Sequence, residues 1–257
     1  MLKHEIFKKL EEHLQYVINE IKIPKERIVG IFLYGSQNYG TDIPLSDVDT
    51  KVIIIPSLDD IIVNKNFISN EITLKDGSHI DIKDIRAYRE NLLKQNINYV
   101  ETLFTEYFLL NPEYKDIFRE CFLQKREEIA RIDMRRSFMA AVKQASHTLS
   151  QYKGDSKKYY NAKRLLYFCE KYLALKPYLE CIKFEKESEE YRYLMNIRMG
   201  KINPSEEDIK ILKNQLEEME TTIDSRYPKA ISLNKDNKEI LDCGIRSLLK
   251  RNILLTF

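Results

Sequence analysis

Two aspartates one residue apart, Asp47 and Asp49, have the residue type and spacing to do chemistry. They stand where a polar loop passes into the apolar run 52–56, which is typical of a buried strand. Side chains alternate between the faces of a strand, so Asp47, Asp49 and Lys51 should share one face. Two carboxylates about 4 Å apart repel by about 4 kcal/mol at an effective dielectric of ~20, so a cation between them is expected. Oxygen ligands favour Mg²⁺ or Mn²⁺ over zinc.

The segment before these aspartates has the composition of a phosphate-binding corner. Residues 28–34 are rich in β-branched and aromatic side chains and predict a buried strand, which Gly35 and Ser36 follow. A glycine there lets backbone N–H groups approach a phosphate without a Cβ in the way. A Gly-Ser turn after a strand is common, so this signal depends on its spacing to Asp47.

A third carboxylate, Asp81, lies on a later predicted strand. Residues 71–74 and 78–83 flank a Lys-Asp-Gly turn and predict a hairpin, in which Asp81 shares a face with His79 and Lys83. With Asp81, catalysis is favoured over a polar strand start; by itself Asp81 fits a solvent-facing hairpin residue nearly as well. His79 and His147 are interpreted as packing or surface residues, and Asp76 and Asp84 as turn and helix-cap residues.

The elements that must position these residues divide the chain into two parts. Residues 3–22 carry apolar side chains at helical spacing and predict an amphipathic helix that packs on the sheet. From residue 84 onward helical spacing dominates, over 84–95, 97–110, 112–150, 156–175, 187–199, 205–222 and 236–253. The expected class is α+β, with a small mixed sheet flanked by helices in residues 1–115 and an all-helical domain in residues 116–257.

Composition limits the class of protein without naming a function. The net charge of +2 with 32% charged residues is typical of a soluble protein, and no apolar run is long enough for a membrane helix. The segment 125–164 is locally basic, with eleven Lys and Arg against four Asp and Glu. The four cysteines lack metal-site spacing and are expected to be buried, reduced thiols in a cytoplasmic protein without a signal peptide.

These motifs together resemble the DNA polymerase beta-type nucleotidyltransferase superfamily. Its pattern is a strand, a Gly-Ser turn, an Asp-x-Asp on the next strand and a third Asp on a later strand. Within it, the chain is most similar to the predicted nucleotidyltransferases of the RNA-repair-pathway DNA polymerase beta family. The further matching segments are 34–40, 84–93, 98–104, 161–166 and 197–200, so the resemblance spans most of the chain.

The resemblance implies a palm-like fold and a two-metal reaction in which an acceptor hydroxyl attacks the α-phosphorus of a nucleoside triphosphate, such as ATP, and pyrophosphate leaves. Asp47 and Asp49 would bind both Mg²⁺ or Mn²⁺ ions, and Asp81 would complete the catalytic ion and orient the acceptor. The β- and γ-phosphates would contact Gly35 and Ser36.

Two basic residues are candidates for further contacts with the nucleotide. Lys51 stands where the family has an arginine, and it keeps the charge but loses the bidentate fork. Lys163, beside Arg164, could reach the triphosphate from the helical domain, although a charged helix face is the more common explanation.

The acceptor is open at this point. The basic segment 125–164, with Tyr152, Tyr159 and Tyr160, suits RNA or tRNA by charge and stacking, and a solvated helix surface explains it equally well. Transfer to a protein or small molecule, as antitoxin-like or drug-modifying relatives do, is the alternative within the superfamily. The third possibility is a non-catalytic nucleotide- or RNA-binding module that retains the fold. The sequence predicts no particular oligomeric state.

Overall fold

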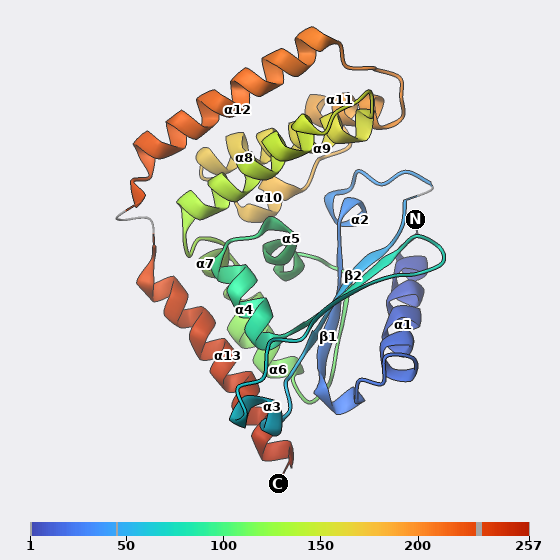
Figure 1. Ribbon diagram of the computed structural model, residues 1–257, viewed down its shortest axis with the longest axis vertical. Coiled ribbons are helices and arrows are strands. Elements are labelled where there is room, and N and C mark those ends of the chain that lie inside the picture. Colours follow the sequence, from blue (N-terminus) through green and yellow to red (C-terminus); the bar gives the residue numbers. More distant parts are fainter. Residues whose placement is uncertain (1, 45, 230–232, 257) are drawn as a thin grey trace.

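A five-stranded mixed sheet forms the centre of the amino-terminal half (Figure 1), in a computed structural model that describes residues 2–44, 46–229 and 233–256. Strands β2 and β4 run parallel, and the other neighbouring pairs run antiparallel. In spatial order the strands are β3 (Ser69–Thr73), β4 (His79–Asp84), β2 (Asp49–Ile54), β1 (Ile28–Tyr34) and β5 (Phe108–Leu110). The expected α+β class with a small mixed sheet is confirmed.

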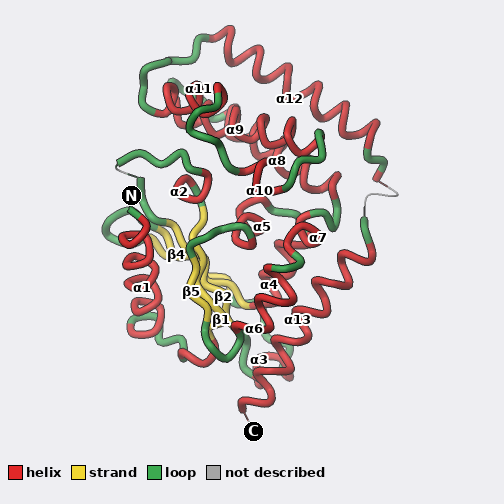
Figure 2. Tube along the Cα trace, turned by 180° about the vertical axis from the view of Figure 1, so that it is seen from behind, coloured by secondary structure: helices red, strands yellow, loops and turns green. Residues whose placement is uncertain are grey.

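Helices cover both faces of this sheet (Figures 1 and 2). Helix α1 (Lys3–Asn19) packs on one face, against apolar side chains that alternate along β2 and β4. On the other face lie α4 (Ile85–Leu93) and α6 (Lys115–Phe118), and α13 (Lys235–Thr256) packs against both of them. Alternation of side chains therefore sends Val48, Val52 and Ile54 toward α1 and leaves Asp49 and Lys51 on the opposite face.

The predicted hairpin is confirmed as β3 and β4. Gly77 in its turn has φ of 87°, and Asp76 accepts a hydrogen bond from the Ser78 backbone N–H at 3.1 Å. Asp84 caps α4 by accepting from the backbone N–H groups of Arg86 and Ala87. Both aspartates have the local roles that were expected for them.

The carboxyl-terminal half is helical, and its helices between residues 134 and 226 lie beyond the end of the sheet from which α2 (Ser36–Tyr39) projects (Figure 1). Helices α8 (Met134–Ser150) and α9 (Ser156–Leu173) pack side by side, with α10 (Tyr178–Ile182), α11 (Glu189–Arg198) and α12 (Glu206–Arg226) around them. Six of the predicted helices match observed ones closely, namely α1, α4, α9, α11, α12 and α13. Short elements not predicted are η1 (Lys25–Arg27), α2, α3 (Leu58–Ile62) and α10.

Two predicted helices are wrong in extent. The segment 97–110 forms α5 (Ile97–Val100) and the 3₁₀ turn η2 (Glu101–Leu103), and it ends as strand β5. This strand fits beside β1 because Gly30 has no side chain; a Cβ there would lie 2.8 Å from the Leu109 carbonyl oxygen. The segment 112–150 is broken into α6, the π-helical turn η3 (Arg119–Leu123), α7 (Arg126–Ala130) and α8.

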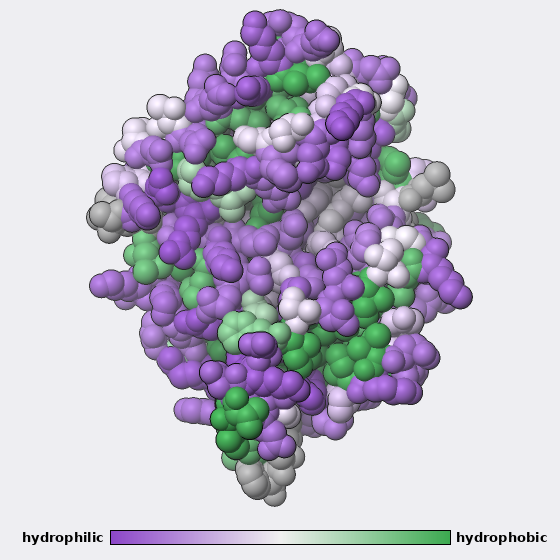
Figure 3. Space-filling view, viewed as in Figure 1, coloured by the Kyte–Doolittle hydropathy of each residue, from purple (hydrophilic) through white to green (hydrophobic). Residues whose placement is uncertain are grey.

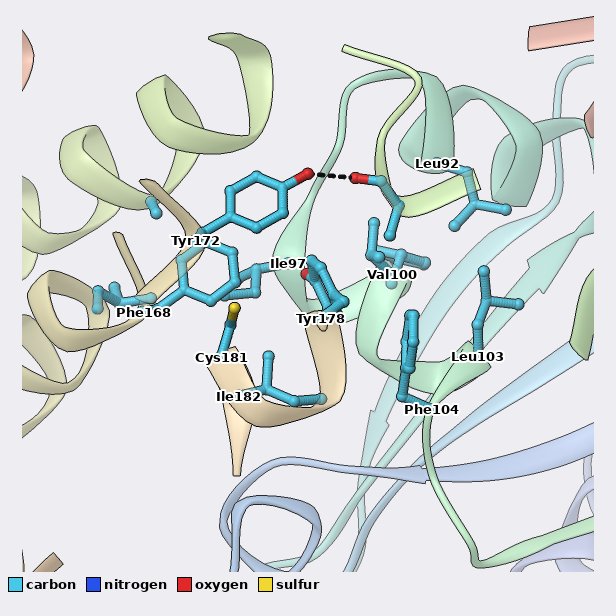
Figure 4. Packing of buried hydrophobic residues seen from close by; sticks show 14 of the residues in the cluster. Leu92, Ile97, Val100, Leu103, Phe104, Phe168, Tyr172, Tyr178, Cys181 and Ile182 are labelled. Atoms are coloured by element: carbon cyan, nitrogen blue, oxygen red, sulfur yellow. Dashed lines mark hydrogen bonds between the residues drawn. The ribbon is translucent and has the colours of Figure 1, made fainter. Parts of the chain in front are cut away.

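One hydrophobic cluster joins the sheet half to the helical half (Figure 4). Phe104, which follows η2, stacks on Tyr178 of α10 with ring centroids 4.8 Å apart, and Tyr178 packs edge-on against Phe168 of α9. The division into domains 1–115 and 116–257 stays a prediction, since the packing runs across it without a break.

Exposed side chains on the face shown in Figure 3 are mostly hydrophilic, and apolar side chains form smaller separate areas. No helix in the described part of the chain is long and apolar enough to cross a membrane. The four cysteines are free thiols; Cys169 and Cys181 are buried as expected, but Cys243 is exposed and Cys121 is half-buried.

Candidate nucleotide and metal site

The end of β2 brings two carboxylates and an imidazole together. Asp47 in the preceding loop, Asp49 at the first position of β2 and His79 at the first position of β4 offer ligand atoms within 4.8 Å of one another. The Asp49 Oδ1 accepts a hydrogen bond from the His79 backbone N–H at 3.0 Å and lies 3.2 Å from its Nδ1. Burial raises the pKa of Asp49, and the charge of Asp47 raises it further. A cation offsets both effects, so this group could hold a metal ion.

The Gly-Ser corner adjoins this group, as its spacing predicted. Tyr34 pairs with Asp49 in the sheet, and Gly35 follows with φ of 87°, a conformation that favours glycine. A Cβ on Gly35 would lie 3.6 Å from the Asp49 Oδ2. Ser36 then begins α2, and the serine and Asp49 line the same pocket.

Asp81 lies on the expected face of β4 but has different neighbours from the aspartate pair. Its oxygens contact the ammonium groups of Lys51 at 2.7 Å and Lys83 at 2.8 Å, and the Tyr99 hydroxyl donates to it at 2.7 Å. Burial raises the pKa of Asp81, but the lysines outweigh burial and hold it below its ordinary value. The catalytic role of Asp81 stays a prediction.

Lys51 is enclosed instead of facing solvent. Its side chain is 3% exposed, and its Nζ lies 3.9 Å from the Tyr34 ring centroid and 4.0 Å from that of Tyr99. Cation–π contacts on both sides hold the ammonium against Asp81. Contact between Lys51 and a nucleotide was predicted from the sequence and stays a prediction.

Basic side chains from the helical half face the carboxylates across a pocket of about 280 Å³. Arg164 and Lys157 of α9 and Arg198 at the end of α11 line it, together with Asp47, Asp49 and Ser36. Arg164 is 5% exposed, and among the described residues its Nε has no hydrogen-bond partner. A pocket with carboxylates on one wall and guanidinium groups on the other can accept an anion together with a cation.

Lys163, which the sequence suggested for the nucleotide, faces elsewhere. Its Nζ donates to the Gln215 Oε1 at 3.1 Å and lies 5.1 Å from the Tyr167 ring centroid, away from the residues that line the pocket. A nucleotide contact for Lys163 stays a prediction. Arg164, the next residue, is the one that reaches the pocket.

Three contacts attach the helical half to the loop and helix that carry the site. The Arg164 guanidinium stacks on the Tyr39 ring at 4.0 Å, and the Thr41 hydroxyl lies 2.5 Å from the Tyr160 hydroxyl. Arg198 Nη2 donates to the Ser46 hydroxyl at 3.0 Å, next to Asp47. The position of Asp47 therefore depends on α11 as well as on the sheet.

Behind Tyr39 lies a fully buried acid, Glu101. It accepts hydrogen bonds from the Tyr39 hydroxyl at 2.9 Å and from the Asn38 side-chain amide at 3.3 Å. Burial raises the pKa of Glu101 to about 7, although the charge of Arg164 and the two hydrogen bonds lower it. Glu101 thus holds two consecutive residues of α2 by buried hydrogen bonds.

Glu101 makes folding stability depend on pH. Its pKa rises from an ordinary 4.5 to about 7 on folding, so between these values the folded protein holds a proton that the unfolded chain has released. The free energy of unfolding should therefore fall by about 3 kcal/mol as pH rises through this window, and then level off. Urea unfolding of the wild type and of Glu101→Gln from pH 4.5 to 8 measures this; equal slopes for both would contradict it.

The sequence interpretation missed His79 and Arg198 as site residues. His79 was interpreted as packing or surface, yet it shares the face of Asp81 and is nearer the strand end, which was the available signal. Arg198 ends a helix about 150 residues from Asp47; its place in the matching segment 197–200 was the available signal, but no role in the site was predicted for it. Lys157 reaches the pocket only through the packing of α9.

Comparisons with known proteins leave the family open. No protein-family model and no curated protein matches the chain. A search of solved structures finds similarity to a nucleotidyltransferase-like protein from Exiguobacterium sibiricum 255-15. The match covers 95% of this chain and 76% of that one, at 14% identity and a TM-score of 0.31. A superposition this loose supports no conclusion about function, which must come from the site.

Proposed function

We propose that the chain is a metal-dependent nucleotidyltransferase that moves a nucleoside monophosphate from a nucleoside triphosphate to an acceptor hydroxyl. The supporting observation is the pocket in which Asp47 and Asp49 face Arg164 and Arg198. A nucleoside triphosphate with its bound divalent ion complements this pocket. The cation can contact the two aspartates while the phosphates contact the two arginines. The ion, Mg²⁺ or Mn²⁺, would neutralise charge that develops on the phosphoryl oxygens.

The residues of the chain would bind and orient the nucleotide in this proposal. Gly35 and Ser36 would contact the phosphates through a backbone N–H and a hydroxyl, from the wall that carries Asp49. Arg164 and Arg198 would bind phosphate oxygens from the opposite wall with charge-assisted hydrogen bonds. The Tyr39 ring, stacked on Arg164, fixes the plane of that guanidinium before any ligand binds.

We further propose that the acceptor is RNA or tRNA, as the rim of the pocket supports. In the first part of the basic segment, Arg131, Arg135 and Arg136 are paired with nearby acids. Lys153 and Lys157, at the turn between α8 and α9, are exposed, and Lys157 also lines the pocket. Exposed cations at the pocket edge would attract the backbone of a single strand.

Nucleotide transfer can be measured directly. The protein should be incubated with each NTP labelled at the α-phosphate, with Mg²⁺ or Mn²⁺, and with tRNA, total RNA or a lysate fraction of proteins and metabolites. Label in RNA is expected. Label in a protein or small molecule instead would keep the transferase and change the acceptor. No label in any fraction with either metal would contradict the proposed function.

Arg198 offers a separate test of the opposite wall. Arg198→Met should weaken binding of the metal-bound NTP by about 10- to 100-fold, since a charge-assisted hydrogen bond contributes about 1.5–3 kcal/mol. Calorimetric titration gives the affinity. Arg192→Met is the matched control, because Arg192 is on the same helix but pairs with Glu187 outside the pocket. Equal affinity for both variants would exclude Arg198 from the phosphate site.

A further inference from the structure

The pairing of β2 with β4 puts His79, and not Asp81, beside the aspartate pair. Lys51 is paired with Asp81 and Thr50 with Ile80, so Asp49 is level with His79. The hydrogen bond from the His79 backbone N–H to Asp49 shows the same register. Asp81 is two residues deeper along β4, which is about 6–7 Å further from the strand end.

The depth of Asp81 coincides with a carboxylate whose two oxygens each contact an ammonium group, although among the described residues Oδ1 has no hydrogen-bond partner of good geometry. One oxygen contacts the Lys51 ammonium and the Tyr99 hydroxyl, and the other contacts the Lys83 ammonium. A metal ion that took Asp81 as a ligand would have to displace at least one ammonium and would then lie close to both. Breaking such a buried ion pair leaves an uncompensated charge, which is strongly unfavourable.

The Lys51 side chain in particular is enclosed by its neighbours. Its side chain is 3% exposed and its ammonium lies between the rings of Tyr34 and Tyr99, each about 4 Å away. His79, by contrast, is half-buried and reaches the pocket, and its ring nitrogen is within 4.8 Å of ligand oxygens of Asp47 and Asp49.

We infer that Asp47, Asp49 and His79 form a site for one divalent ion, and that Asp81 is the fixed counter-charge of Lys51 and Lys83. The inference depends on the proposed function only in the use of the ion, since its ligands follow from the register and the ion pairs. One nitrogen and two carboxylate ligands favour Mn²⁺ and later first-row ions over Mg²⁺. The chain therefore departs here from the three-carboxylate pattern that its sequence suggests.

Titration of the full-length protein with Mn²⁺ alone, followed by electron paramagnetic resonance, tests this inference. We expect one bound Mn²⁺ per chain, with pulsed spectra that show coupling to a ¹⁴N nucleus. His79→Gln should remove that coupling and weaken Mn²⁺ binding at least about tenfold. His147→Gln is the matched control, because that exposed histidine lies outside the site and its loss should leave both readouts unchanged.

A second variant examines Asp81 without changing the net charge. Asp81→Asn combined with Lys51→Met removes one charge of each sign, and Mn²⁺ affinity should stay within about threefold of the wild type. In the wild type, any of three results would overturn the inference: two bound ions, one ion without ¹⁴N coupling, or no binding. These results do not depend on whether the double variant folds. Nucleotide transfer is assayed on the same samples: transfer without ¹⁴N coupling overturns the inference alone, and ¹⁴N coupling without transfer overturns the proposed function alone.

Discussion

Asp49→Asn should lower the rate of nucleotide transfer by about three orders of magnitude while the protein stays folded. The substitution keeps the shape of the side chain and removes the charge that faces Asp47 and His79. Stabilisation of the transferring phosphoryl group by a bound divalent ion amounts to several kcal/mol, and each 1.4 kcal/mol changes a rate tenfold. Transfer of α-phosphate label from NTP to RNA, measured under single-turnover conditions, gives the ratio of rates.

The free energy of unfolding of Asp49→Asn should not be lower than that of the wild type. Burial and the charge of Asp47 both raise the pKa of Asp49, so the ionised carboxylate is held at a cost that asparagine does not carry. Asp59→Asn, on the exposed side of α3, is the matched control and should transfer at the wild-type rate. If Asp49→Asn retained more than about a tenth of the activity, the carboxylate pair could not be the centre of the reaction.

Phe104→Ala should lower the free energy of unfolding by about 3–5 kcal/mol, the largest stability effect that we expect of a single substitution away from the site. The ring is 1% exposed and stacks on Tyr178, so its removal leaves a cavity between the sheet half and the helical half. Urea unfolding measures the loss. Phe67→Ala is the control, because that ring is 49% exposed and its removal should cost less than about 1 kcal/mol.

The shape of the unfolding curve carries further information. A cluster shared by both halves predicts one cooperative transition, monitored equally by tyrosine fluorescence and circular dichroism. Two separate transitions, with Phe104→Ala affecting only one, would show that residues 1–115 and 116–257 unfold independently. In that case the packing around Tyr178 would be a weak contact between domains.

Local chemistry determined which parts of this molecule could be predicted from the sequence. The alternation of Val48, Asp49, Thr50 and Lys51 was enough to assign their faces, because a half-buried strand has a period of two. The turn at Gly77 and the cap at Asp84 follow from equally local rules. These features needed no knowledge of how distant segments pack.

What the sequence did not predict depends on contacts between distant segments. Strand β5 has only three residues, too few to show the alternation of side chains that predicts a strand. It can pair with β1 because Gly30 has no side chain to block it. The pairing of Lys51 with Asp81 depends on the register of two strands that thirty residues separate. Arg198 reaches Ser46 only because α11 folds back over the end of the sheet.

The buried hydrogen bonds around Tyr39 and Glu101 bear on how a substrate gains access. A hinge motion that swung the helices away from the sheet would pull Arg164 off the Tyr39 ring, whose hydroxyl donates to the buried Glu101, and would break the hydrogen bond from Arg198 to Ser46. Losing a shielded cation–π contact and a hydrogen bond from a charged donor costs about 3–5 kcal/mol in total, so fewer than roughly one molecule in a hundred would be open at a given moment. Nucleotides should therefore diffuse in through a permanently formed mouth, at rates that solution viscosity limits more than any gating step.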